Sequence, residues 1–174
     1  MKSVRNGGIL TSYLYNGMGQ RVAKMGAAGE TTYYVYDEQS HLVGGYDTFG
    51  KAIEETVYLG DLPVAVLTGT ASAAPIGPAA RTSVAYVYAD HINTPRMLTR
   101  ASDNKVVWEW DNADPFGLYH PDENPSRLGV FTYNPRFPGQ YYDKETNLHY
   151  NYYRDYDPQT GRYVQSDPMG CAAG

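Results

Sequence analysis

The chain has 174 residues, a formal net charge of −5, 42% hydrophobic residues and 19% charged residues. This length suits one domain or part of one, and the composition can build a core. The negative charge argues against a protein that binds nucleic acid through its phosphates, since that mode needs a basic face. The single cysteine, Cys171, excludes an internal disulfide and a multi-cysteine zinc site.

Tyrosine sets the expected fold class. The chain holds 18 Tyr against 4 Phe and 2 Trp, together with 18 Gly and 11 Pro. Tyr suits a pleated, half-buried surface on which its hydroxyl reaches water, while Gly and Pro mark turns. The composition therefore predicts an all-β protein. No run approaches the roughly 20 apolar residues that span a bilayer, and no apolar stretch follows Lys2 and Arg5, so we expect neither a membrane span nor a signal peptide.

A repeat with a spacing of 21 residues opens the chain. Residues 13–16 read Tyr-Leu-Tyr-Asn and residues 34–37 read Tyr-Val-Tyr-Asp, each followed by turn residues and a second apolar stretch. Tyr-x-Tyr places two rings on one face of a strand, and the Asp or Asn then opens a turn in which Gly supplies positive φ. Each unit is predicted to be a β-hairpin. Because one hairpin is marginal in water, the units must stack into a continuous, curved antiparallel sheet.

The same pattern continues at residues 57–67 and 86–90. Between them, residues 68–81 are rich in Ala, Gly, Pro and Thr and lack a strand period, which indicates a surface loop inserted in one domain. Residues 106–111 then alternate strongly, which predicts a strand with Val106, Trp108 and Trp110 on one face. Prolines interrupt residues 118–138, so we expect no central strand there.

The last third of the chain has a repeat of its own, with a spacing of 14 residues. The six residues from Asp143 to Leu148 align with the six from Asp157 to Arg162. An opening Asp and an Asn or Gly at the left-handed position favour a type I turn with a bulge. Two successive hairpins are therefore predicted.

This ordered series of motifs resembles the Rhs/YD-repeat family and, near the C-terminus, its repeat-associated core. Besides the tyrosine–aspartate units, the resemblance rests on five segments, residues 90–96, 137–143, 152–158, 161–163 and 166–170. It covers nearly the whole chain. It divides the chain into a YD-repeat shell segment, residues 1–117, and a core segment, residues 118–174, which stops before the toxin region.

The resemblance implies a β-shell that encloses a toxin domain. Members of the family are bacterial polymorphic toxins and insecticidal toxin-complex subunits, together with the related animal teneurins. Their repeats form a hollow shell, often called a cocoon, that encapsulates a C-terminal toxin. The expected partners are therefore other repeats or chains of the shell and a toxin domain. The expected location is bacterial, in the cytoplasm before delivery or secreted and at the cell surface with a larger assembly.

The resemblance also implies autoproteolysis. The family's core resembles an intramolecular aspartic protease that cuts just after Asp-Pro-x-Gly-Leu, and this chain has Cys171 in place of the Leu. The expected cleavage region is therefore Gly170, Cys171 and Ala172. Asp143 and Asp167 are the candidate catalytic pair, since two nearby carboxylates can split into an ionised base and a protonated acid.

Arg136 is the third candidate catalytic residue, because its guanidinium could hold an Asp ionised or steady an oxyanion. Arg127 is a weaker candidate for that role. Simpler interpretations stay open: the two Asp residues as turn openers, and Arg136 as an ordinary cation of the shell.

No conventional catalytic or metal motif is present. The sequence contains no Gly-x-Ser-x-Gly, no phosphate-binding Gly-rich loop and no His-Glu-x-x-His. His41, His91, His120 and His149 lack ligand spacing, so we expect no metal and no cofactor. Two further functions remain open. One is an orphan shell fragment without catalysis, and the other is a carbohydrate-binding surface on which exposed Tyr, Trp108 and Trp110 stack against sugars.

Overall fold

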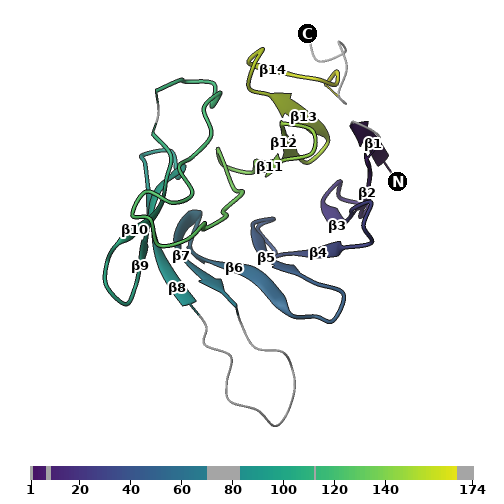
Figure 1. Cartoon of the computed structure of the whole chain (residues 1–174). Coiled ribbons are helices and arrows are strands. Elements are labelled where there is room, and N and C mark those ends of the chain that lie inside the picture. The colour runs from purple at the N-terminus through teal and green to yellow at the C-terminus, as the bar shows by residue number, and fades with distance from the viewer. Residues whose placement is uncertain (1, 7–8, 70–82, 112, 168–174) are drawn as a thin grey trace.

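The computed structural model describes residues 2–6, 9–69, 83–111 and 113–167, which form two antiparallel sheets and no helix (Figure 1). Sheet A contains β1 (Lys2–Asn6), β2 (Ile9–Tyr15), β3 (Arg21–Met25), β4 (Thr31–Tyr36), β5 (Leu42–Tyr46), β6 (Ala52–Leu59), β7 (Leu62–Thr68), β8 (Ser83–Ala89), β9 (Pro95–Arg100) and β10 (Val106–Glu109). Sheet B contains β11 (Tyr141–Asp143), β12 (Leu148–Asn151), β13 (Arg154–Asp157) and β14 (Arg162–Tyr163). Within each sheet, every strand pairs with its neighbours in sequence. The predicted all-β fold of successive hairpins is confirmed.

The turn predicted from the repeats recurs along sheet A. After β2, Asn16 Oδ1 accepts hydrogen bonds from the backbone N–H groups of Met18 (3.0 Å) and Gln20 (2.9 Å), and Gly19 has a φ of 76°. Asp47, Asp90 and Asp114 accept the equivalent pair of N–H bonds in their turns. The short acceptor side chain satisfies the backbone where the chain reverses, so the predicted role of Asp and Asn is confirmed.

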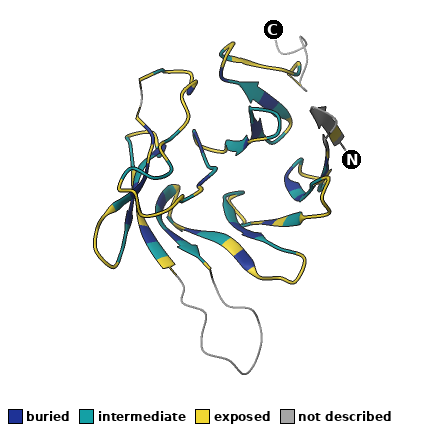
Figure 2. Cartoon of the chain, viewed as in Figure 1, coloured by how far each residue is buried: buried dark blue, intermediate teal, exposed yellow. Residues whose placement is uncertain are grey.

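Sheet A is curved, and sheet B lies on its concave side (Figure 1). The register shifts where a strand meets its turn, as between Leu14 and Tyr15, between Val35 and Tyr36, and between Val57 and Tyr58. Such bulges bend a strand and increase its twist, and their repetition accounts for the curvature. Exposed residues gather in the hairpin turns, and buried positions lie within the strands (Figure 2).

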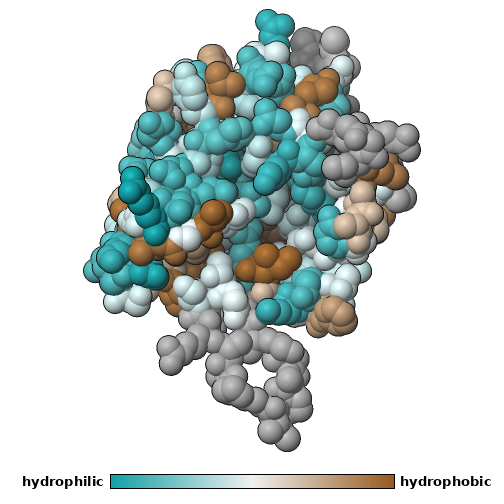
Figure 3. Space-filling model, viewed as in Figure 1, coloured by the Kyte–Doolittle hydropathy of each residue, from teal (hydrophilic) through white to brown (hydrophobic). Residues whose placement is uncertain are grey.

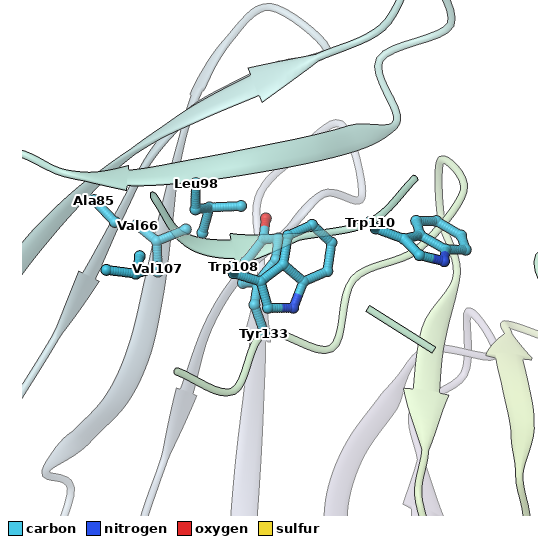
Figure 4. Close-up of a cluster of buried hydrophobic side chains, with 7 residues drawn as sticks. All are labelled: Val66, Ala85, Leu98, Val107, Trp108, Trp110 and Tyr133. Carbon is cyan, nitrogen blue, oxygen red and sulfur yellow. The ribbon is translucent and has the colours of Figure 1, made fainter. Parts of the chain in front are cut away.

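The hydrophobic core lies at the β7–β10 end of sheet A (Figure 4). Its buried members are Val66, Ala85, Leu98, Val107, Trp108, Trp110 and Tyr133. The indole of Trp108 meets the ring of Tyr133 edge to face, with a centroid distance of 5.6 Å. Tyr133 comes from the segment between the two sheets, which the structure shows to be free of strands, as predicted. This segment closes the end of sheet A.

The structure corrects the predicted face of Val106, and it describes only part of the predicted loop. The register shifts between Val106 and Trp108, so Val107 is buried beside Trp108 while Val106 is only half-buried. The prediction that Val106 shares a face with the two Trp residues is therefore wrong. Of the predicted loop, residues 68–81, Thr68 ends β7, and residues 70–81 lie outside the described residues.

Candidate functional site

The inward tyrosines of sheet A meet the tyrosines of sheet B. Ring centroids lie 6.0 Å apart for Tyr15 and Tyr150 and 5.5 Å apart for Tyr34 and Tyr141. The Tyr150 hydroxyl donates to Gly19 O at 3.0 Å and accepts the Arg21 backbone N–H at 2.7 Å. The Tyr-x-Tyr repeat therefore supplies both packing surface and hydrogen bonds to the junction between the sheets.

An ion pair lies at the centre of this junction. Arg21 begins β3 and Asp143 ends β11, 122 residues later in the sequence. The guanidinium donates from Nη1 to Oδ1 at 2.6 Å and from Nη2 to Oδ2 at 2.5 Å, and the side chains are 2% and 3% exposed. It also lies over the rings of Tyr13, at 4.4 Å, and Tyr150, at 4.0 Å. Arg21 is thus held by a bidentate carboxylate and two aromatic faces.

The electrostatics of the pair favour two charged partners. Burial raises the pKa of Asp143 above its ordinary value, while Arg21 and Lys24 act in the opposite direction. Burial also disfavours the charge on Arg21, but Asp143 outweighs it, and the pKa of Arg21 is raised. Arginine does not release its proton, and a protonated Asp143 would leave the buried guanidinium without a counter-ion. The pair is therefore ionised.

A second polar contact flanks the first. Glu145 accepts hydrogen bonds from Lys24 Nζ at 2.7 Å and from the Tyr13 hydroxyl at 2.5 Å. Burial acts to raise the pKa of Glu145, but the bonds from Lys24 and Tyr13 leave it lowered. Sheet A thus contributes two cations and sheet B two carboxylates to one junction.

The structure places the three candidate catalytic residues in different surroundings. Asp143 is the buried partner of Arg21, whereas Asp167 is half-exposed, with its Oδ2 3.0 Å from Arg154 Nη1. Arg136 is 3% exposed, and its Nη1 donates to the carbonyls of Tyr133 (2.8 Å) and Pro135 (3.0 Å). Burial lowers the pKa of Arg136 to about 10. The cleavage region, Gly170 to Ala172, lies outside the described residues.

The structure also bears on the predictions about sugar binding, metal binding and a membrane span. Trp108 and Trp110 are 0% and 2% exposed, so they cannot form a platform for sugars, and that alternative is wrong for these two residues. Among the described residues, no three His, Cys, Asp or Glu side chains form a metal-binding group. Nor does that part of the chain contain a helix long and apolar enough to cross a membrane.

Sequence reasoning missed Arg21. In the 21-residue repeat it occupies the position that Leu42 takes in the next unit. A cation at a position where the repeat has an apolar residue was the available signal, because a buried charge needs a partner. The sequence could not identify that partner, since Asp143 also fits its predicted role as a turn opener: its carbonyl accepts the Asn147 N–H at 2.9 Å.

A cavity of about 340 Å³ separates the middle of sheet A from sheet B and the segment before it. Its wall includes Tyr34, Tyr58, Tyr133, Arg136, Tyr141 and Tyr152. The hydrophobic residues seen on the outer surface are scattered among hydrophilic ones and form no single patch on that face (Figure 3).

No family model matches the chain, but curated relatives do. Toxin protein Tse5 of Pseudomonas aeruginosa is 36% identical over 92 residues, 52% of this chain and 6% of that protein. Probable deoxyribonuclease RhsA of Dickeya dadantii is 53% identical over 89 residues, 51% of this chain and 6% of that protein. Double-stranded DNA deaminase toxin A of Burkholderia cenocepacia is 29% identical over 188 residues, 97% of this chain and 13% of that protein. The chain spans only a small part of these three relatives.

Solved structures share the fold. TcdB2-TccC3 without its hypervariable C-terminal region matches 98% of this chain and 8% of that chain, with a TM-score of 0.61 and 21% identity. The Tc holotoxin pore of Photorhabdus luminescens matches 96% of this chain and 8% of that chain, with a TM-score of 0.56 and 20% identity. The antiparallel sheets described above therefore match a segment of the TcdB2-TccC3 shell.

Proposed function

The chain belongs to the Rhs/Tc toxin family, as part of its repeat-containing β-shell, and on this premise we propose that residues 118–174 are a core segment closing the shell built by residues 1–117. In this proposal the core holds the chain for a single self-cleavage that frees a C-terminal toxin. The partners are further shell repeats, which pair with the outer edge of β1. Within the described residues β1 has one neighbouring strand, so its outer backbone groups remain for pairing, whereas the outer edge of β10 already bonds Asp122.

The buried pair of Arg21 and Asp143 is the observation that carries the proposal. A core segment that closes a shell must stay seated on the strands around it, and this contact joins one strand of each sheet. Both charges are almost fully buried and both carboxylate oxygens are used. Separating the two sheets would expose both charges to solvent or leave each of them buried without its counter-ion. The buried pair therefore resists separation of the sheets more strongly than an exposed pair would.

The surroundings of the two aspartates support different roles in peptide cleavage. Asp167 is half-exposed and paired with Arg154, which suits a base that takes a proton from water as the water attacks the carbonyl. Arg21 keeps Asp143 ionised while the core is seated, so cleavage begins with the separation of this pair. Burial then raises the pKa of Asp143 without opposition from Arg21, and Asp143 takes up a proton and becomes the acid that polarises the carbonyl. Arg136 steadies the oxyanion. The shell holds its own chain in place, which removes much of the entropic barrier, and one turnover is sufficient.

Intact mass spectrometry on a chain extended beyond Gly174 tests this function. The extended chain should be cut at Gly170 to Ala172, and Asp143→Asn and Asp167→Asn should each abolish the cut. Asp157→Asn is the matched control, because Asp157 opens the equivalent turn of the 14-residue repeat and binds the Gln159 N–H at 2.9 Å. This control variant should still be cut.

Three other outcomes separate the remaining possibilities. Cleavage that persists in both the Asp143→Asn and Asp167→Asn variants overturns the catalytic assignment. An uncut wild-type chain that is cut after Cys171→Leu identifies a degenerate site, and an uncut chain in both forms leaves the non-catalytic shell fragment as the function.

A further inference from the structure

The cavity between the two sheets contains an unpaired buried charge. Arg136 lines it, and its Nη1 bonds go to two neutral backbone carbonyls. Its guanidinium also lies 4.9 Å from the Tyr142 ring centroid and 5.5 Å from that of Trp110. No carboxylate of the described residues lies within ion-pair distance of Arg136. Buried cations are ordinarily paired, and an arginine cannot escape the cost by losing its proton.

Glu123 is a carboxyl group that acts to raise the pKa of Arg136, and Arg136 acts to lower the pKa of a second one, Glu54 on β6. Among the described residues, neither forms an ion pair with Arg136. Burial dominates, and it raises the pKa of Glu54 to about 7. Glu54 is therefore a poor permanent counter-ion at neutral pH, and the positive charge of Arg136 remains available to a ligand.

Tyr133 lines the same cavity, but its hydroxyl does not add a donor to it. The hydroxyl oxygen is buried from solvent, and its contact with Thr56 acts to lower the pKa of Tyr133. The hydroxyls of Tyr58 and Tyr152 are engaged with Leu42 O and Ser40 O. Arg136 is therefore the group of this wall that can attract an anion.

We propose that this cavity binds a monoanionic carboxylate with a compact apolar body, held by Arg136. One unpaired guanidinium matches one negative charge, whereas a dianion would leave a second charge unpaired in a buried site. Ring surface from Tyr, Pro63, Pro95 and Pro138 lines much of the wall, which suits an apolar body. The other charged groups of the wall, Arg21 and Asp61, already contact Asp143 and His41. A volume of about 340 Å³ is within the size range of small-molecule pockets.

This site shares Arg136 with the self-cleavage proposed above but does not depend on that reaction. It requires the folded chain and Arg136, and it makes no use of Asp143 or Asp167. A chain that never cuts itself would still bind the carboxylate. The carboxylate could come from a free organic acid or from the C-terminus of a peptide, so the experiment includes both.

Isothermal titration calorimetry on the 174-residue chain compares matched acids and neutral analogues. The probes are 3-phenylpropionate against 3-phenylpropan-1-ol, and N-acetylphenylalanine against its amide. The tighter of the two acids should bind at least about tenfold more tightly than its neutral analogue, which is the expected effect of a charged hydrogen-bonded pair. That acid identifies the source, free or peptidic. Sulfate should bind more weakly than either acid.

Arg136→Met localises the effect, with circular dichroism to confirm the fold. This variant should reduce the preference for the acid over its neutral analogue to less than about twofold. Equal binding of acid and analogue by the wild-type chain, no binding of either acid, or tighter binding of sulfate overturns the proposal. These wild-type outcomes decide the matter even if a variant fails to fold.

Discussion

The junction between the sheets and the hairpin joining β9 to β10 each hold a bidentate Arg–Asp pair, in opposite surroundings. Arg21 and Asp143 are 2% and 3% exposed and 122 residues apart, whereas Arg100 and Asp103 are 35% and 32% exposed and three residues apart. Nη2 lies 2.5 Å from Oδ2 in both pairs. The same bidentate interaction therefore joins two segments distant in sequence at the junction, whereas in the hairpin it lies within one turn. Burial, not geometry, decides which pair matters to the fold.

Breaking the buried pair should have the largest effect. Asp143→Asn leaves the Arg21 guanidinium buried without a counter-ion, and we expect the free energy of unfolding to fall by about 3–5 kcal/mol. Urea denaturation followed by tyrosine and tryptophan fluorescence measures the change. A decrease in the free energy of unfolding below about 1 kcal/mol would mean that the buried pair contributes no more to stability than an exposed pair does.

The tyrosine hydroxyls of the junction should have the next largest effect. Tyr150→Phe removes the acceptor of the Arg21 backbone N–H and the donor to Gly19 O, so unfolding should become easier by about 1–2 kcal/mol. Tyr153→Phe is the matched control, because the Tyr153 side chain is exposed and bonds only Met18 O. It should change stability by less than about 0.5 kcal/mol, and equal effects would show that burial at the junction is irrelevant.

Glu54 gives the inner face of sheet A a pH dependence. Burial raises its pKa from 4.5 to about 7, so the folded chain binds this proton more tightly than the unfolded chain does. The stabilisation is fully present below pH 4.5 and is lost as pH rises towards 7. Part of the side chain still reaches solvent, so we expect wild type to lose about 1–2 kcal/mol relative to Glu54→Gln across this range.

Comparing wild type with Glu54→Gln cancels the contribution of other titratable groups to the pH dependence of stability. Burial lowers the pKa of His149 to about 3, which makes the chain more stable as pH rises from 3 to 6.5, opposite in sign to Glu54. Both proteins contain His149, so the difference between their stability curves reports on Glu54. Parallel curves would contradict the assignment.

The exposed pair should have the smallest effect. Arg100→Ala removes the two bonds to Asp103, yet solvent screens the charges, and the free energy of unfolding should change by far less than it does for Asp143→Asn. The same urea titration measures it, with 0.5 M salt as the second condition. A loss comparable to that of Asp143→Asn would mean that bidentate geometry, and not burial, sets the strength.

The sequence predicts local structure well because the signals are local. Asn16 and Asp90 open the expected turns, and Tyr13 and Tyr34 point inward as period two requires. Val106 was misassigned because a one-residue register shift exchanges the two faces of a strand, and nothing in the alternating pattern reveals it.

The candidate site was less accessible to sequence reasoning. Asp143 could be identified from its motif, but its partner lies in another sheet, and any of several arginines satisfies the same chemistry. The unpaired charge of Arg136 depends on which side chains fail to reach it, which is a property of packing alone. The catalytic roles of Asp143, Asp167 and Arg136 remain predictions.

The central claim is that sheet B is held on sheet A by the buried pair, and a double-mutant cycle tests it most directly. Arg21→Met, Asp143→Asn and the combined variant give the coupling free energy, and the same cycle at Arg100 and Asp103 provides the reference. We predict a coupling of about 2–3 kcal/mol for the buried pair and a much smaller coupling for the exposed pair. Equal couplings in the two cycles would contradict the claim.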